Sequence, residues 1–407
     1  MNSNEKTFRD EIEDPNQLLS DIGGKPILNH SCEQRSSEAV TPNSSVRSPF
    51  KMPLPDTVEL PAAFDAHVHL RDDDMLQIVA PTVRPGGVNQ ALIMPNLQNN
   101  LVTSVKRALD YSSRIKAALG KDEVDLLMTL YLHQDVTPDT IREAKKAGVA
   151  AVKSYPAGVT TNSADGVVDY DAFHEVFKAM EEVDLLLCLH GECPSHAGSD
   201  ITTLNAESKF LPTLKALHAK YPKLRIILEH CTTAEAVAAV KSCGPNVAGT
   251  ITCHHLFITI DDVVGDALNF CKPLPADRKA LLNAVVNSNG KFFLGTDSAP
   301  HPITAKTGPS KAAAGVFTQP YAVQYLLAAL DEAVARGELA DADITQEALE
   351  GFVSGYGRKF YGTEDTRKER IRLTRDGGAV VQQTFEGKGI QVVPFRAGKE
   401  TWSLTWL

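Results

Sequence analysis

The feature that most constrains the fold is an alternation of short apolar runs with longer amphipathic segments, which begins near residue 61. Eight apolar runs of strand length follow one another within about 240 residues, the length of a typical (β/α)8 barrel. Such an alternation favours parallel strands joined by helical crossovers. We therefore predict an α/β fold of the TIM-barrel type. The apolar runs occupy residues 62–70, 90–96, 125–132, 148–155, 184–192, 224–231, 246–255 and 291–300.

Several segments between these runs carry signals for the start and end of a helix. Thr137 and Pro138 are typical of a helix N-terminus, and Gly148 is typical of the end of the same helix. A second helix is predicted to begin with hydroxyl residues from Thr232 and to stop at Gly244. Helical spacing of apolar residues also marks residues 170–183, 210–220, 277–287 and 321–336.

The two ends of the chain depart from the barrel pattern. Residues 1–55 are rich in serine and acidic residues, which predicts a mobile polar N-terminal extension and argues against a mitochondrial presequence. Residues 391–407 alternate apolar and polar side chains, which predicts strands packed beside the barrel. We therefore expect one barrel domain over residues 56–407 that includes the C-terminal tail.

Charge and cysteine content exclude several classes of partner and location. The 41 Lys and Arg residues against 51 Asp and Glu give a net charge of -10, which argues against a nucleic-acid partner. No apolar run approaches the roughly 18 residues that a membrane-spanning helix needs. Seven cysteines without a CxxC pair, and without a recognisable secretory leader, indicate reduced thiols and predict a cytoplasmic location.

Residues that can bind metals or carry out catalysis stand at the ends of the predicted strands. The spacing of His67 and His69 points both imidazoles to one face of a strand. In a barrel, the C-terminal strand ends meet at one rim, so the residues there are expected to converge. The set predicted at this rim is His67, His69, Lys153, His190, His230 and Asp297.

Four imidazoles and one carboxylate at one rim indicate a metal site. This donor set suits zinc first, although manganese, cobalt or iron use the same atoms. A catalytic zinc ion must keep one position open for water, so these ligands exceed what one ion needs and predict two metals. The remaining histidines are assigned no function, which includes His133, His254 and His255 near strand ends as well as His30, His174, His196 and His218.

Lys153 is the unusual member of the set, because a cation is repelled by metal cations unless its amine is neutral or modified. A carbamate formed on its nitrogen from carbon dioxide would convert it into a bridging anion. Two other readings are an ion-paired lysine at the rim and a Schiff-base lysine. The surrounding histidines argue against the Schiff base.

Six motifs in order resemble those of the dihydroorotase family, in its compact single-function type, within the amidohydrolase superfamily. The resemblance extends from about Phe64 to the VVPF of the tail and includes AGVF at Ala314. The six motifs are DAHVHLRD from Asp65, MPN from Met94, KSYPAGVTTNS from Lys153, HGE from His190, EH from Glu229 and GTDSAPH from Gly295.

The resemblance implies a role for each matching residue. It implies that His67, His69 and Asp297 hold one zinc ion, that His190 and His230 hold a second, and that Lys153, carboxylated at its side-chain nitrogen, bridges the two. It also implies the residues around the substrate. These are Arg71, Asn96 and His301 at its carboxylate, Thr160 and Thr161 in a loop that closes over it, and the main chain near Lys272 and Ala314.

The activity implied by the resemblance is the reversible, zinc-dependent cyclisation of N-carbamoyl-L-aspartate to L-dihydroorotate with loss of water. This is the third step of de novo pyrimidine (UMP) biosynthesis. Asp297 would take the proton of the attacking hydroxide and pass it to the departing ring nitrogen. The family also suggests a homodimer.

Two alternatives remain open at this stage. Another cyclic amide hydrolase, such as a hydantoinase or an allantoinase, would share both metals and the carbamate. Its uncharged ring would not need the carboxylate-binding residues Arg71, Asn96 and His301. A non-catalytic scaffold is the second alternative, but such a protein is expected to lose metal ligands, and all six are present.

Overall fold

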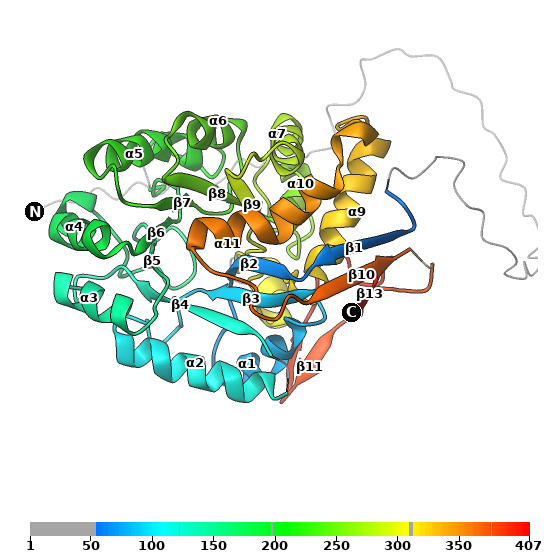
Figure 1. Ribbon diagram of the computed structural model, residues 1–407, viewed down its shortest axis with the longest axis horizontal. Helices are drawn as coiled ribbons and strands as arrows, with labels where there is room; N and C mark the ends of the chain where they lie inside the picture. Colours follow the sequence, from blue (N-terminus) through cyan, green and yellow to red (C-terminus); the bar gives the residue numbers. More distant parts are fainter. Residues whose placement is uncertain (1–53, 122, 197, 309–311, 376) are drawn as a thin grey trace, which may run out of the picture. The chain divides into compact units, whose positions relative to one another are not determined.

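The computed structural model describes residues 54–407 except 122, 197, 309–311 and 376. In this part of the chain, eight parallel strands follow one another around a nearly closed barrel in sequence order (Figure 1). The predicted (β/α)8 barrel is confirmed. The strands are β2 Ala63–Val68, β3 Val88–Ile93, β4 Asp125–Tyr131, β5 Ala151–Ser154, β6 Leu186–Leu189, β7 Ile226–Leu228, β8 Val247–Ile251 and β9 Phe292–Leu294.

Helices connect successive strands and cover the outside of the barrel (Figure 1). The predicted cap at Thr137 is present, because its side-chain oxygen accepts a hydrogen bond from the Thr140 amide at 3.2 Å. The helices are α1 Asp73–Val79, α2 Val105–Leu119, α3 Pro138–Lys146, α4 His174–Val183, α5 Ala206–Lys220, α6 Ala234–Ser242, α7 Pro275–Val286, α8 Ile303–Thr307, α9 Ala322–Ala335, α10 Gln346–Glu350 and α11 Tyr356–Tyr361. A π-turn, Gly351–Gly355, joins α10 to α11. Short 3-10 turns occupy Ala80–Thr82, Tyr170–Phe173, Cys253–Leu256, Ile260–Val263, Gln319–Tyr321 and Asp341–Asp343.

The C-terminal tail forms strands beside the barrel, as predicted. β13 (Ser403–Trp406) pairs with β10 (Arg370–Thr374), which pairs in turn with β1 (Thr57–Pro61), and all neighbours are antiparallel. β11 (Phe385–Gly387) and β12 (Ile390–Val392) form a separate hairpin. The predicted extension over residues 1–55 lies almost entirely outside the described residues. None of the described helices is both long enough and apolar enough to cross a lipid bilayer.

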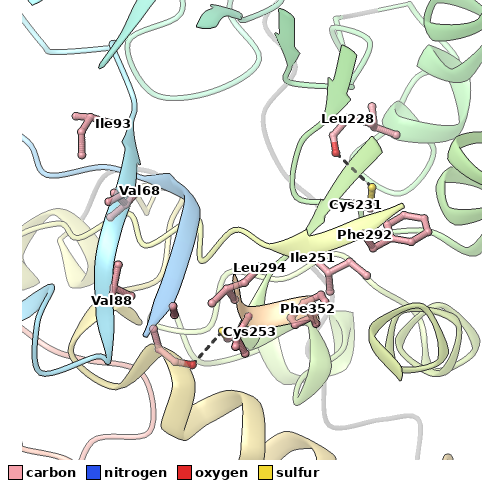
Figure 2. Close-up of a cluster of buried hydrophobic side chains, with 14 of the residues drawn as sticks. Val68, Val88, Ile93, Leu228, Cys231, Ile251, Cys253, Phe292, Leu294 and Phe352 are labelled. Atoms are coloured by element: carbon pink, nitrogen blue, oxygen red, sulfur yellow. Dashed lines mark hydrogen bonds between the residues drawn. The ribbon is translucent and has the colours of Figure 1, made fainter. Parts of the chain in front are cut away.

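Alternate side chains of the strands build two separate hydrophobic clusters. The outer cluster lies between the strands and the helices, and Figure 2 shows part of it, including Val68, Ile251 and Leu294. In the same view, the Sγ atoms of Cys231 and Cys253 donate to main-chain carbonyl oxygens at 3.5 and 3.4 Å. All six described cysteines are free thiols, in keeping with the sequence prediction.

The inner cluster and α11 close the end of the barrel opposite the predicted site. Tyr361 of α11 places its ring 5.2 Å from that of Phe64 in β2. Arg358 of the same helix donates hydrogen bonds to the side chains of Gln90 and Asn89 in β3, at 2.9 and 2.6 Å. Because this end is filled, a ligand reaches the barrel from the C-terminal strand ends.

The first and last strands of the barrel meet just beyond β9, at a junction that we call the seam. The Asp297 amide donates to the His67 carbonyl at 2.9 Å, and the His69 amide donates to the Ser298 carbonyl at 3.0 Å. Beneath these bonds, the buried Asp65 carboxylate accepts hydrogen bonds from the Thr296 amide and hydroxyl at 2.8 and 2.7 Å. The seam therefore fixes the backbone of three predicted metal ligands.

Candidate active site

Three predicted ligands, His67, His69 and Asp297, bring one donor atom each to a common point. The Nε2 atoms of the two histidines lie 3.3 Å apart, and Asp297 Oδ1 lies 3.3 Å from each of them. Donors that surround a zinc ion tetrahedrally at 2.0–2.1 Å are separated from one another by about 3.3 Å. The three atoms thus have the separation that a tetrahedral metal requires, and these residues form a group able to hold a metal ion.

Buried hydrogen bonds orient His67 toward this point. Its Nδ1 lies 2.8 Å from Glu229 Oε2, which leaves Nε2 for a metal. The hydroxyl of Thr250 donates to the same carboxylate oxygen at 2.7 Å and accepts a bond from the His230 amide at 2.6 Å. Glu229 and Thr250 therefore link the strand end that carries His67 to the strand end that carries His230.

Two of the ligand positions have unusual backbone conformations. His230 and Asp297 adopt φ angles of 42° and 44°, in the left-handed region that residues other than glycine rarely occupy. Such conformations cost free energy and persist where the surrounding structure holds them. At Asp297, the seam hydrogen bond to His67 supplies that restraint.

Lys153 lies at the end of β5, completely buried beneath the histidines. Among the described residues, its Nζ has no hydrogen-bond partner, and it lies 5.1 Å from the centre of the Tyr155 ring. Burial lowers the pKa of the Lys153 amine. A buried ammonium without a partner is unfavourable, so this position suits a neutral amine or a modified one.

His190 and His230 form the other part of the ligand cluster. Their ring centres lie 4.6 Å apart, and the ring of His230 lies 5.3 Å from that of His67. Burial lowers the pKa of both His190 and His230, which keeps them neutral as metal ligands must be. All six predicted ligands thus lie in one cluster at the C-terminal end of the barrel.

Glu192 and Lys272 support His190. Glu192 Oε2 lies 3.3 Å from His190 Nε2, and its other oxygen forms an ion pair with the Lys272 amine. Although burial acts to raise it, the charge of Lys272 and the contact with His190 lower the pKa of Glu192 to about 2. Glu192 therefore contacts one ring nitrogen of His190, as Glu229 contacts one ring nitrogen of His67.

The ligand cluster lines one side of a cleft, and most of the predicted substrate residues line the rest. Arg71, Asn96, Thr160, Thr161, Lys272 and Ala314 all contribute to its walls. His301 lines an adjoining cavity that shares Arg71 and Asn96 with the cleft. Its Nε2 lies 3.1 Å from Arg71 Nη2, and Arg71 Nε donates to the Pro300 carbonyl at 2.8 Å. The guanidinium is therefore held in place at the junction of the two spaces.

Four residues that sequence reasoning left without a role also border or support the cleft. His254 and His255 follow β8 and line the cleft, and burial lowers the pKa of both. Glu229 directly precedes the predicted ligand His230, and Glu192 lies two positions after the predicted ligand His190. Their places at the ends of predicted strands could therefore have identified both carboxylates. His133, His174 and His218 lie outside the cleft, with partners at 3.2, 2.6 and 3.2 Å respectively.

The chain is similar to known proteins over most of its length. A protein of Schizosaccharomyces pombe named "Probable dihydroorotase" is 44% identical over 355 residues, covering 86% of this chain and 99% of that protein. The dihydroorotase of Saccharomyces cerevisiae is 42% identical over 370 residues, covering 86% of this chain and 98% of its own.

A solved structure gives the same result in three dimensions. The crystal structure of dihydroorotase from Saccharomyces cerevisiae in complex with 5-fluoroorotic acid has a TM-score of 0.79 and 41% sequence identity, and the match covers 86% of this chain and 99% of that chain. No protein-family model matches the chain.

Proposed function

The chain belongs to the dihydroorotase family of the amidohydrolase superfamily, and from this we propose that it interconverts N-carbamoyl-L-aspartate and L-dihydroorotate in pyrimidine biosynthesis. It is thus a hydrolase acting on cyclic amides. The observation that carries the proposal is the convergence of a metal-binding cluster and the Arg71 guanidinium in one cleft. The cluster suits hydrolysis of an amide, and the guanidinium suits a substrate with a free carboxylate.

We propose that the cleft holds two zinc ions. His67, His69 and Asp297 would hold one, and His190 and His230 would hold the other. The equal 3.3 Å separations in the first group support this assignment. When bound, the zinc ions would polarise the carbonyl group of the substrate and make water nucleophilic at neutral pH.

Lys153 would bridge the two ions as a carbamate. Its neutral amine attacks carbon dioxide, a nitrogen–carbon bond forms, and one proton is released to solvent, which leaves an anionic carboxylate on the nitrogen. The buried Nζ without a partner supports this assignment, because the modification replaces an unfavourable ammonium by a metal ligand. The lowered pKa supports it as well, since only the free amine reacts.

Arg71, Asn96 and His301 would bind the carboxylate that does not react. A guanidinium forms paired hydrogen bonds with a carboxylate, and the contacts of Arg71 with Pro300 and His301 fix its direction. Burial lowers the pKa of His301 to about 3, so its neutral ring accepts a bond from Arg71. Thr160, Thr161, Lys272 and Ala314 would form the remaining walls around the substrate.

Asp297 would carry the proton. In ring opening, its carboxylate takes the proton of the attacking water and delivers it to the departing ring nitrogen. In ring closure, the ureido nitrogen would attack the side-chain carboxylate carbon, Asp297 would pass the nitrogen proton to the departing carboxylate oxygen, and a second proton from solvent would complete the water that leaves. Its seam bond holds the carboxylate against the two histidines, within reach of the reacting group.

We further propose that the chain acts as a homodimer in the cytoplasm and that residues 1–55 form a polar extension to the domain 56–407. The family resemblance suggests the dimer. The free thiols support a reducing compartment. The acidic balance of the sequence supports small-molecule substrates in place of nucleic acid.

Ring opening of L-dihydroorotate by the purified protein, followed by ultraviolet absorbance, tests the proposed function. We expect turnover that disappears when a chelator removes the metal and returns when zinc is restored. Absence of turnover in protein with a full complement of zinc would contradict the proposal. Hydantoin and allantoin, assayed in parallel, would then identify a different cyclic amide.

A further inference from the structure

The segment after β5 forms a compact loop, residues 156–167, which we call the cleft loop. Pro156 and Val167 pair as a β-bridge at its base. Inside the loop, the nearly completely buried hydroxyl of Ser163 donates to the Thr160 carbonyl at 2.7 Å and accepts from the Thr160 amide at 3.0 Å. The loop is therefore held in shape by its own hydrogen bonds, and it presents Thr160 and Thr161 to the cleft.

Two hydrogen bonds dock the cleft loop onto Asn96, which follows β3. The side-chain amide of Asn162 donates to the Asn96 carbonyl at 3.0 Å. In return, the side-chain amide of Asn96 donates to the Thr161 carbonyl at 3.0 Å. Asn162 has a φ of 54°, a left-handed conformation that asparagine tolerates better than most residues, and this conformation turns its side chain toward Asn96.

Tyr155 sets the orientation of the Asn96 amide. Its hydroxyl donates to Asn96 Oδ1 at 3.0 Å, so the Nδ2 group faces the cleft loop. The Nδ2 group carries two protons, of which the bond to Thr161 uses one.

We propose that Asn162 is a positioning residue that latches the cleft loop over the active site through the main chain of Asn96. This inference rests on the proposed function, because it assigns Asn96 both to the substrate carboxylate and to the docked loop. A substrate that orders Asn96 favours the docked loop, and the docked loop in turn orders Asn96 for the substrate.

The test compares two variants of Asn162. Asn162→Asp keeps the size and the left-handed tendency of the residue but replaces the donor by an oxygen that repels the Asn96 carbonyl. Asn162→Gly removes the side chain and adopts the same φ without strain. Loss of one such bond corresponds to about a 3- to 10-fold change, so we expect KM for L-dihydroorotate to rise about 3- to 10-fold with a smaller change in kcat.

A second readout does not depend on turnover. Hydrogen–deuterium exchange of amides in the cleft loop should accelerate by a similar factor in both variants, while the zinc content stays the same. The matched control is Asn246→Asp, which makes the same chemical change at a half-buried asparagine that donates to the Pro222 carbonyl at 2.8 Å and does not line the cleft. This control should leave both KM and exchange of the cleft loop unchanged.

Each outcome decides the inference. Wild-type exchange of the cleft loop in both Asn162 variants would overturn the latch, even if KM rises, because Asn162 would then act on the substrate directly. Faster hydrogen–deuterium exchange of the cleft loop with an unchanged KM would show that the contact is purely structural, and this result would also overturn the latch. If the wild-type protein fails to turn over L-dihydroorotate, the proposed function fails, and accelerated exchange alone would support the docking contact but overturn its role in this reaction.

Discussion

The two parts of the ligand cluster differ in how completely the folded chain forms them. His67, His69 and Asp297 already place three donor atoms 3.3 Å apart. His190 and His230 are in ring contact, but the group that would join them to the first part is the buried amine of Lys153. The first part is therefore preformed by the fold, whereas the second, under the proposed function, would be completed by a chemical modification of Lys153.

The cause of this difference lies in the strands that carry each part. The first part straddles the seam, where main-chain hydrogen bonds connect the residues on either side. The second part comes from β5, β6 and β7, which are neighbours in the sheet and are already paired along their length. Regular pairing positions Lys153, His190 and His230 near one another, but it does not supply the bridging anion that the proposed function requires.

Removal of the Asp297 carboxylate should have the largest effect. Asp297→Asn keeps the side-chain volume and tolerates the left-handed backbone, but it cannot accept the proton and is a poor ligand. We expect kcat for ring opening to fall by about 10⁴-fold, since proton transfer by a positioned group contributes about 10²–10⁴ and the metal contributes in addition. Steady-state kinetics with zinc in excess measures this. Loss of less than tenfold would contradict the proton-carrying role.

Lys153→Ala should affect the second part selectively. We expect activity to fall by about 10³-fold and zinc content to drop from two ions to one per chain, because the bridging anion is lost while the preformed part remains. A short-chain carboxylic acid supplied with zinc should partly restore activity. Metal analysis after dialysis, together with the rescue assay, measures the effect. Full activity of the variant would exclude the bridging role.

The two supporting carboxylates should show an intermediate effect, each on its own part. Glu229→Gln should weaken zinc binding at the first part, and Glu192→Gln should weaken it at the second, by about 10- to 100-fold, because each replaces the charged acceptor that orients a histidine ring by a weaker neutral one. Competition with a chromophoric chelator measures the two affinities separately. Equal weakening of both ions by either variant would show that the two parts act as a single unit.

Glu207 should have the smallest effect on activity and a visible effect on stability. Its buried carboxylate accepts bonds from the Thr232 and Thr233 amides at 2.9 and 2.7 Å, next to the second part of the cluster. Burial raises the pKa of Glu207 to about 7. Between about pH 4 and 7, the Glu207 carboxyl therefore keeps its proton in the folded protein but has lost it in the unfolded chain. As a result, the free energy of unfolding falls as the pH rises through that range.

Urea unfolding at pH 5 and pH 8 measures this contribution. The wild-type protein should lose up to about 3 kcal/mol more stability between the two pH values than Glu207→Gln does, since one pKa unit corresponds to about 1.4 kcal/mol. The comparison of the two proteins cancels the other titrating groups. Identical pH dependence would show that Glu207 titrates normally.

Strand periodicity explains why much of the molecule could be predicted from the sequence. Residues at the C-terminal end of a parallel strand share one rim, so Lys153, His190 and His230 could be placed from their runs alone. Helix caps such as Thr137 could also be predicted, because the hydrogen bond that forms the cap joins residues three positions apart. The same logic applies to the tail, where alternation is visible in β13.

Other features depend on contacts that no local pattern encodes. Which nitrogen of His67 faces the metal is decided by Glu229, 162 positions away in sequence. His254 and His255 reach the cleft because a 3-10 turn follows β8, and a strand pattern does not predict that turn. The closure of the barrel end by α11 likewise depends on Arg358 finding partners in β3.

The seam joins the first barrel strand to the last, so His67 and Asp297 are separated by about 230 residues of chain. A metal ion bound to both in the folded chain would be released on unfolding, so it would stabilise the fold through its own binding free energy. Under the proposed function, metal occupancy would therefore set the stability of the folded chain as well as its chemistry.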